Sequence, residues 1–388
     1  MSEKNSIKKD FLFELGLVIL IGATLSFLVS SVAYGVDIKI HNSFLDEYLQ
    51  NELFPIPPGY YFLLWSVDLL FHYKYPFLVA SLIVISIFIY LKYKITSIYF
   101  KKNLGVDTRL ALIFSIGLFF FGPIVVPSID GDFWYFGKFT PTIWHNSTVI
   151  AVLPFCILLY FKCLDWWKSK SSGDLVQMFV LGLVILLIKP SFLFCLLPIL
   201  PVFTYVKLKY SKELWWSITF SIVFLLGIFI EKHLIYSWDP LLLRDYQAEF
   251  RPKVIIAPFQ IFLHYSSQPV WDLGSSFLLV FYFMLVFGKK ASRSLPVVFA
   301  FVLLFVAMLI YLIFAETGYR ELHANFYWQI PITYYLVLLA MLSWVWNAYG
   351  NFHWKSNWKP TGFFLLFFMH FAFGLAYWGR IFLEKMIS

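Results

Sequence analysis

The chain has 388 residues, of which 61% are hydrophobic, 22% aromatic and only 13% charged, and its formal net charge is +8. Soluble domains contain roughly 45–50% apolar and about 25% charged residues, so this composition excludes a water-soluble globular protein and leaves lipid as the solvent for most of the surface. The positive charge does not indicate nucleic acid, because Lys and Arg also gather on the cytoplasmic side of membrane proteins.

Apolar runs that are long enough to cross a hydrocarbon core of about 30 Å as a helix recur along the whole chain. We predict one all-α domain over residues 1–388, a polytopic bundle of about eleven transmembrane helices without a separate soluble domain. The spans are expected at 11–34, 76–95, 109–127, 146–163, 175–189, 191–206, 214–236, 270–288, 295–315, 329–346 and 361–381. The stretch 59–71 is too short to cross and contains Asp68, so it is expected as a short helix in the membrane interface.

The basic residues support this choice of spans. With 59–71 kept out of the membrane, every basic cluster falls on one side, which we assign to the cytoplasm together with the N-terminus. These clusters lie at 4–9, 92–109, 162–170, 207–212, 289–293 and 355–359. Most acids, histidines and loop tryptophans fall on the opposite side, in outer loops at about 35–75, 128–145, 237–269 and 316–328. A functional site is therefore expected on the extracytoplasmic face.

The first outer loop begins with a candidate pair for acid–base chemistry. Asp37 follows the first predicted span directly, and His41 comes four residues later, so the two share a face if this segment is helical. A carboxylate there could deprotonate an acceptor hydroxyl, with His41 tuning it or contacting a phosphate. The structural alternative is that Asp37 only caps an interfacial helix and His41 is solvated. Asp46-Glu47 is a competing acid pair in the same loop.

The rest of this region adds a recognisable order of elements. Pro57-Pro58-Gly59-Tyr60-Tyr61 opens the interfacial stretch, which leads into a span with basic residues at its end. Over residues 10–100 this order resembles the GT-C superfamily, the multi-spanning glycosyltransferases that use polyprenyl-phosphate sugars, such as aminoarabinose and protein mannosyl transferases. Ile56 departs from the family, which often has His or Lys before the two prolines.

The resemblance implies a function and a location. Asp37 would be the catalytic acid of an inverting glycosyltransferase in a bacterial cytoplasmic membrane, acting on a polyprenyl-phosphate-linked sugar and a lipid- or glycan-linked acceptor. It implies no further residue roles. Beyond residue 100 the resemblance is only architectural.

Two other outer segments carry candidate binding residues. Trp144, His145 and Asn146 stand where the chain re-enters the membrane, and a stacking face, a ring and an amide together suit a sugar subsite. An aromatic belt residue followed by a helix cap explains them equally well. In the loop 316–328, His323 and Asn325 suit sugar hydroxyls.

Two cations are candidates for the donor phosphate. Lys189 interrupts a long apolar stretch at an outer turn, where it could bind a phosphate. The alternative is a lysine that snorkels to the interface. Arg320, in the loop 316–328, offers a planar fork suited to phosphate. A solvated hairpin would explain the charges of that loop but not its Asn-Phe-Tyr-Trp run.

Two other functions stay open. A polysaccharide polymerase or ligase would use a large basic outer loop, for which 237–269 is the candidate, and a non-enzymatic transporter of lipid-linked glycans would need ionisable residues at mid-bilayer. No cofactor is certain, since the chain has no Gly-rich nucleotide loop and its three cysteines lack metal-ligand spacing. Asp37 and other outer acids could bind a divalent metal, although no spacing requires one.

Overall fold

A computed structural model describes residues 13–24, 26, 37–71, 77–131, 137–245, 252–350 and 357–387. Within these ranges the chain is helical apart from loops and two three-residue strands, β1 (Val254–Ile256) and β2 (Phe314–Glu316), which pair antiparallel. The predicted all-α class is confirmed. The basic cluster at 4–9 and a large part of the first predicted span lie outside the described residues.

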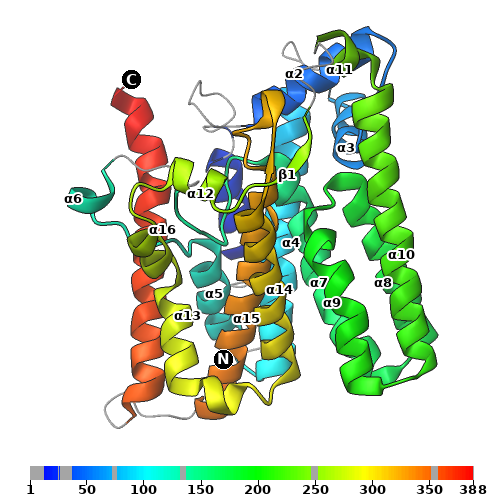
Figure 1. The fold of residues 1–388 in the computed structure, drawn as a ribbon. Helices are drawn as coiled ribbons and strands as arrows, with labels where there is room; N and C mark the ends of the chain where they lie inside the picture. Colours follow the sequence, from blue (N-terminus) through cyan, green and yellow to red (C-terminus); the bar gives the residue numbers. More distant parts are fainter. Residues whose placement is uncertain are drawn as a thin grey trace.

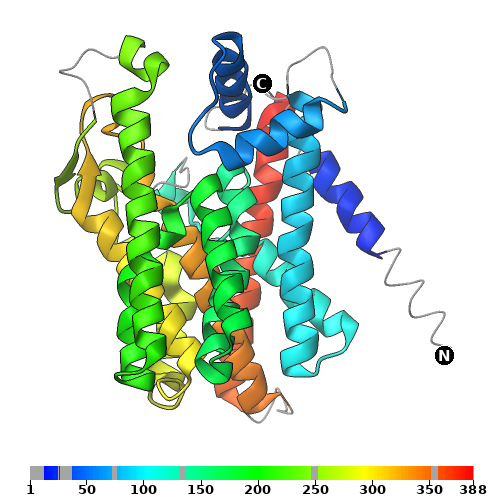
Figure 2. The ribbon, with the colours of Figure 1, turned by 90° about the vertical axis from the view of Figure 1, so that its right-hand side faces the viewer.

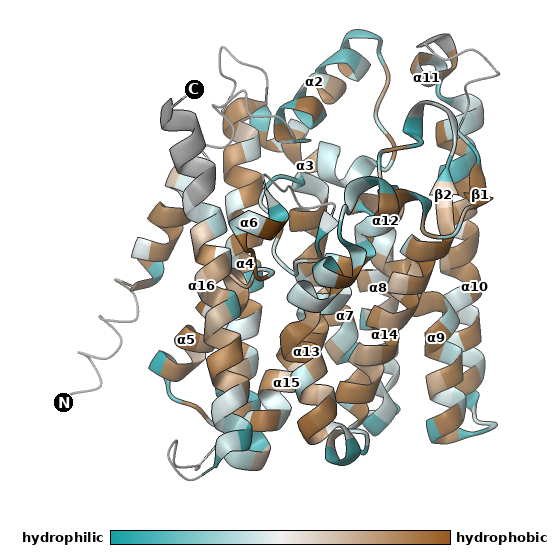
Figure 3. Cartoon of the chain, turned by 60° about the vertical axis from the view of Figure 1, so that its left-hand side comes forward, coloured by the Kyte–Doolittle hydropathy of each residue, from teal (hydrophilic) through white to brown (hydrophobic). Residues whose placement is uncertain are grey.

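Within the described ranges, eight helices are long and apolar enough to cross a membrane, and they stand side by side as a bundle (Figure 1). They are α4 (Leu78–Leu104), α7 (Ser147–Ser169), α9 (Ser191–Leu208), α10 (Lys212–His233, continued by the π-helical η2, Leu234–Trp238), α13 (Pro269–Ala291), α14 (Leu295–Ile313), α15 (Gln329–Tyr349) and α16 (Trp358–Ile387). The protein is therefore a multi-pass membrane protein. Figure 3 shows hydrophobic residues along the lengths of these helices.

Three further apolar helices are shorter, so the prediction of about eleven spans is not confirmed. They are a helix over Phe13–Thr24, α5 (Thr108–Phe119) and α8 (Ser172–Ile188). The expected span 109–127 is wrong in its second half, because α5 ends at Phe119 and residues 121–126 are not helical. Pro123 lies within this stretch and has no N–H with which to continue a helix.

The non-helical stretch 121–126 passes between two of the long helices. The N–H of Gly122 donates to the carbonyl of His370 on α16 at 3.1 Å, and that of Ile124 donates to the carbonyl of Ser275 on α13 at 3.1 Å. The ring of His370 lies 2.7 Å from the carbonyl oxygen of Gly122, so it packs within the bundle as a structural residue. A Cβ at Gly374 would lie only 1.5 Å from the carbonyl oxygen that precedes the stretch. Irregular backbone inside a membrane bundle needs such partners.

The shorter elements gather at one end of the bundle. They include α2 (Asp37–Gln50), α3 (Pro58–Asp68), α6 (Pro127–Asp130), α11 (Pro240–Asp245), α12 (Gln260–Tyr265), η4 (Gly318–Arg320) and η5 (Asn325–Tyr327). Figure 2 shows α3 lying across the long helices, in agreement with the prediction that 59–71 does not cross the bundle. Its outward residue Phe62 is 54% exposed, whereas Tyr60 and Leu64 are buried.

The turns that carry the basic clusters lie mostly at the other end. The turns joining α7 to α8, α9 to α10 and α13 to α14 are all at the bottom of Figure 1. The prediction that Lys92 belongs to the cytoplasmic basic cluster 92–109 is wrong. Because α4 continues to Leu104, Lys92 lies well inside the helix, and only 7% of its surface is exposed.

A buried group of charges joins the loop before α7 to α13. The ammonium of Lys138 lies 2.8 Å from Asp130 and 2.9 Å from Asp272, and its side chain is 1% exposed. It also donates to Ser275 at 2.6 Å and lies 5.4 Å from the centre of the Trp271 ring. This charge group fixes the start of the loop that leads to Asn146.

Candidate functional site

Asp37 begins α2 and is bound on two sides by the loop that precedes α7. Its backbone N–H donates to the carbonyl of His145 at 3.0 Å, and the side-chain amide of Asn146 donates to its Oδ2 at 2.5 Å. Asn146 is also the N-cap of α7, with its Oδ1 accepting from the N–H of Val149 at 3.0 Å. Because the cap uses the oxygen of this amide, its nitrogen is directed at Asp37.

Lys189 lies at the other end of the same hydrogen-bonded chain. It occupies the turn between α8 and α9, and its Nζ donates to Thr148 Oγ1 at 3.0 Å. Thr148 in turn contacts Asn146 Oδ1 at 3.0 Å. The Lys189 ammonium also lies 5.4 Å from the centre of the Trp328 ring. Three hydrogen bonds, each 3.0 Å or shorter, therefore connect Asp37 to Lys189.

The surroundings bring the pKa values of both groups toward neutrality. Burial raises the pKa of Asp37 to about 6, against the opposing effects of the Lys189 charge and the Asn146 hydrogen bond. Burial lowers the pKa of Lys189 to about 8, with Asp37 opposing and Arg320 adding to the shift. A carboxylate with a pKa near the working pH is suited to general-base catalysis.

His41 lies one helical turn beyond Asp37 and contacts α3. Its Nδ1 is 2.7 Å from the hydroxyl of Tyr61. Desolvation and the nearby charge of Lys189 lower the pKa of His41 to about 3, so its ring is neutral at pH 7. A neutral ring can donate or accept a hydrogen bond but cannot bind a phosphate as a cation. The charge of Arg320 opposes the rise in the pKa of Tyr61 that burial causes.

Asp37, His41, Asn146, Thr148 and Lys189 form a cluster, and Arg320 lies near it. It belongs to η4, and its Nη1 donates to the hydroxyl of Tyr236 at 2.7 Å, with the guanidinium 5.2 Å from the centre of that ring. Its effect on the pKa of Lys189 shows that the two cations act on the same region. Of the two cations predicted to bind a phosphate, Lys189 is therefore joined to the predicted carboxylate by hydrogen bonds, whereas the guanidinium of Arg320 is bonded to Tyr236.

Three other predicted residues contribute less directly. The ring of His145 packs edge-on against Trp328 with centroids 5.9 Å apart, and burial lowers its pKa to about 4. Asn325 donates to Glu316 at 2.5 Å, which engages its amide. His323 is exposed on one side, and partial desolvation together with the charge of Arg320 lowers its pKa.

Trp144 is not part of the cluster. Only 4% of its surface is exposed, and its ring packs against Phe119 and Phe120 with centroid distances of 5.1 and 5.7 Å. These neighbours belong to the hydrophobic core. The ring of Trp144 therefore lies in the core, where it also lines a small internal cavity.

Four residues that contact the predicted ones were not themselves predicted as site residues: Thr148, Tyr61, Trp328 and Tyr236. Two of them end motifs described above, Tyr61 the Pro-Pro-Gly-Tyr-Tyr run and Trp328 the Asn-Phe-Tyr-Trp run, and Thr148 comes two residues after Asn146. Tyr236 gave no signal, because it falls in the expected span 214–236. Tertiary contact alone identifies it.

An open apolar groove with about 500 Å³ of free space lies beside the cluster. It is lined by Leu49, Phe54, Pro58, Gly59, Phe62, Trp65 and Leu187. Gly59 packs directly against α8, since a Cβ there would lie 2.8 Å from the carbonyl oxygen of Leu187. Leu187 is two residues before Lys189, so one wall of the groove lies close to the turn that carries the ammonium group.

Among the described residues, no group of three or more His, Cys, Asp or Glu is arranged to hold a metal ion. No protein-family model matches the chain, and no curated protein matches it.

Proposed function

We propose that the protein is a membrane glycosyltransferase that moves a sugar from a polyprenyl-phosphate donor to an acceptor hydroxyl at the extracytoplasmic face. One observation carries the proposal: Asp37 and Lys189 stand at the two ends of one hydrogen-bonded chain beside an open apolar groove. The donor has a long apolar chain, a phosphate and a sugar. The groove would hold the apolar chain, Lys189 the phosphate, and Asp37 would lie beside the sugar.

The reaction assigns a separate task to each charged group. The carboxylate of Asp37 takes the proton of the acceptor hydroxyl, whose oxygen attacks the anomeric carbon of the sugar. The bond from that carbon to the phosphate oxygen breaks, and the polyprenyl phosphate leaves with the electron pair. Lys189 and Arg320 stabilise the negative charge that develops on it. Attack from the side opposite the leaving group inverts the anomeric configuration, and neutral His41 helps to orient the acceptor.

The deciding experiment follows the donor in detergent micelles, which have no sealed compartments. Purified protein is mixed with a polyprenyl-phosphate sugar and a hydroxyl acceptor, and free polyprenyl phosphate is measured by mass spectrometry. A transferase releases it in proportion to the protein. A transporter leaves the donor intact in micelles and moves it only across sealed vesicles, and a polymerase or ligase consumes only diphosphate-linked glycans. Either of the last two results would overturn the proposal.

The pH dependence of this activity gives a second prediction. Because the pKa of Asp37 is raised to about 6, kcat/KM is expected to fall about tenfold per pH unit below pH 6 as the base is protonated. Because the pKa of Lys189 is lowered to about 8, the rate is expected to fall again above that pH. Initial rates between pH 5 and 9 test this bell shape, and a flat profile would exclude Asp37 as the base.

The groove gives a third prediction. Leu49→Trp places a larger side chain in the groove, so KM for a long-chain donor is expected to rise at least about tenfold, which corresponds to roughly 1.4 kcal/mol of binding free energy. A donor with only two isoprene units does not fill the groove and keeps its KM. Leu70→Trp is the matched control, because Leu70 is 77% exposed and does not line the groove. Equal effects on both donors would show that the chain binds elsewhere.

A further inference from the structure

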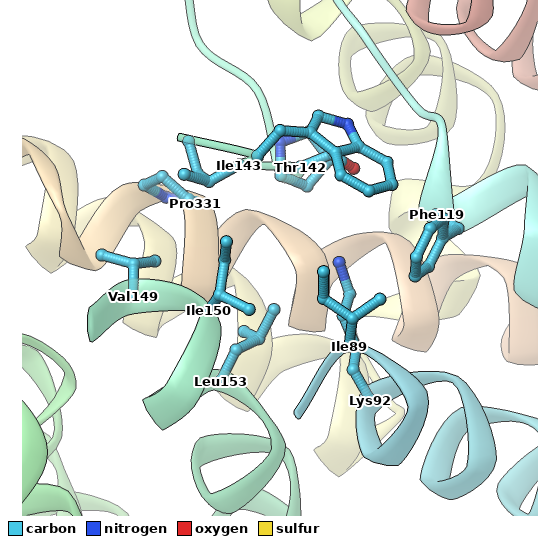
Figure 4. Close-up of a pocket in the computed structure, with 11 residues that line it drawn as sticks. Ile89, Lys92, Phe119, Thr142, Ile143, Val149, Ile150, Leu153 and Pro331 are labelled. Carbon is cyan, nitrogen blue, oxygen red and sulfur yellow. The ribbon is translucent and has the colours of Figure 1, made fainter. Parts of the chain in front are cut away.

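A second, small cavity lies inside the bundle beside Lys92 (Figure 4). Its lining includes Phe119, Thr142, Trp144, Val149, Ile150 and Pro331. These residues come from α5, the loop before α7, α7 itself and α15. Figure 4 shows the amine of Lys92 rising between Ile89 and Phe119 toward this space.

Lys92 has no anionic neighbour in the described part of the chain. Its ammonium lies 4.4 Å from the centre of the Tyr335 ring and 5.5 Å from that of Phe119, and no hydrogen bond or ion pair within that part reaches it. Burying an ammonium without a counter-ion is energetically unfavourable. Two aromatic faces recover only part of this cost.

Two helix N-termini also contribute residues to the cavity wall. Val149 and Ile150 belong to the first turn of α7, and Pro331 belongs to the first turn of α15. Helix N-termini carry roughly half a positive charge. None of the residues that line the cavity is acidic. The ammonium and both helix ends therefore favour an anion in the same place.

The size of the cavity limits the ligand to a single small particle. It leaves about 20 Å³ for the centre of a water-sized sphere, and one water needs roughly 10–15 Å³ by this measure. We propose that this cavity binds one monovalent anion of the size of chloride, which acts as the counter-ion of Lys92. The proposal does not depend on the transferase activity.

Thermal unfolding of the purified protein tests the proposal. Replacing sodium gluconate by sodium chloride or bromide at constant ionic strength is expected to raise the Tm of the wild type to a plateau, because the anion binds the folded state. Lys92→Met removes the cation, and Val149→Ile fills the cavity while keeping Lys92. Both variants are expected to lose the halide response. Lys94→Met is the matched control, because Lys94 lies on the same helix as Lys92 and pairs with Glu14 at 2.6 Å. This variant is expected to keep the halide response.

Anomalous diffraction from crystals grown in bromide locates the ion directly. The expected result is a bromide peak in the cavity within hydrogen-bonding distance of Lys92 Nζ, absent in Val149→Ile. A water molecule there without anomalous signal would overturn the proposal. So would a halide response that both variants retain.

Discussion

Replacing Asp37 with Asn is expected to lower kcat for sugar transfer by about 10²- to 10⁴-fold, the range that a general base contributes. The amide keeps the shape of the side chain, and its oxygen can still accept the hydrogen bond from Asn146. What it loses is the ability to take a proton from the acceptor. The loss is therefore expected in kcat, with KM for the donor within about threefold of the wild type.

The same variant is expected to be at least as stable as the wild type at pH 7. Burial raises the pKa of Asp37 from 3.8 to about 6, so the folded chain binds a proton more tightly than the unfolded chain does. The contribution of Asp37 to stability is therefore greatest below pH 4 and is lost as the pH rises to 6. The ionised carboxylate costs on the order of 3 kcal/mol at neutral pH, and an Asn at this position does not incur that cost.

Activity and thermal unfolding measured on one preparation separate this prediction from a folding defect. Asp46→Asn is the matched control, because Asp46 lies on the same helix and its carboxylate accepts a hydrogen bond from the side-chain amide of Gln50 at 2.8 Å. It is expected to retain full activity. Activity in Asp37→Asn comparable to that of the control would mean that another group is the base.

Lys138→Met is expected to lower the free energy of unfolding by about 3–5 kcal/mol, because it removes the cation that pairs with Asp130 and Asp272 in a buried ion group. Asp130 and Asp272 would be left facing each other without the ammonium that lies 2.8 and 2.9 Å from them. The loop that leads to Asn146 would lose its attachment to α13. Sugar transfer is therefore expected to fall together with stability, and unfolding in a denaturing detergent measures the loss.

Two comparisons make this result specific. Lys162→Met breaks the partly exposed pair with Asp174, whose atoms are 3.0 Å apart, and is expected to cost at most about 1 kcal/mol. Adding Asp130→Asn and Asp272→Asn to Lys138→Met removes the uncompensated charges and is expected to recover most of the stability. If the triple variant were as unstable as the single one, the loss would come from packing and not from charge.

The helices could be predicted from the sequence because lipid imposes a simple rule on them. A run of apolar residues such as 295–315 forms a helix in any arrangement of the bundle, and α14 begins at its first residue. The end of α5 could not be predicted, because it depends on partners that come from His370 and Ser275, far along the chain. Lys92 illustrates the same limit: spacing placed it in a basic cluster, but the length of α4 buries it.

The candidate site shows a similar division. Asp37 and Lys189 stood out because ionisable residues are costly next to apolar spans, and the structure connects them. Trp144 stood out because its ring could stack on a sugar. An aromatic residue is equally suited to a core, and its ring packs there against Phe119. Sequence identifies residues that need an explanation, whereas only packing distinguishes a ligand-facing ring from a buried one.

The contacts of residues 121–126 also determine when the site can form during synthesis. This stretch obtains its hydrogen-bond partners from α13 and from α16, the last helix of the described chain. It precedes the loop that presents His145 and Asn146 to Asp37. Asp37 emerges from the ribosome early, but its surroundings are completed only when the final helix has entered the bundle. A partly synthesised chain therefore has Asp37 without the loop contacts that position it.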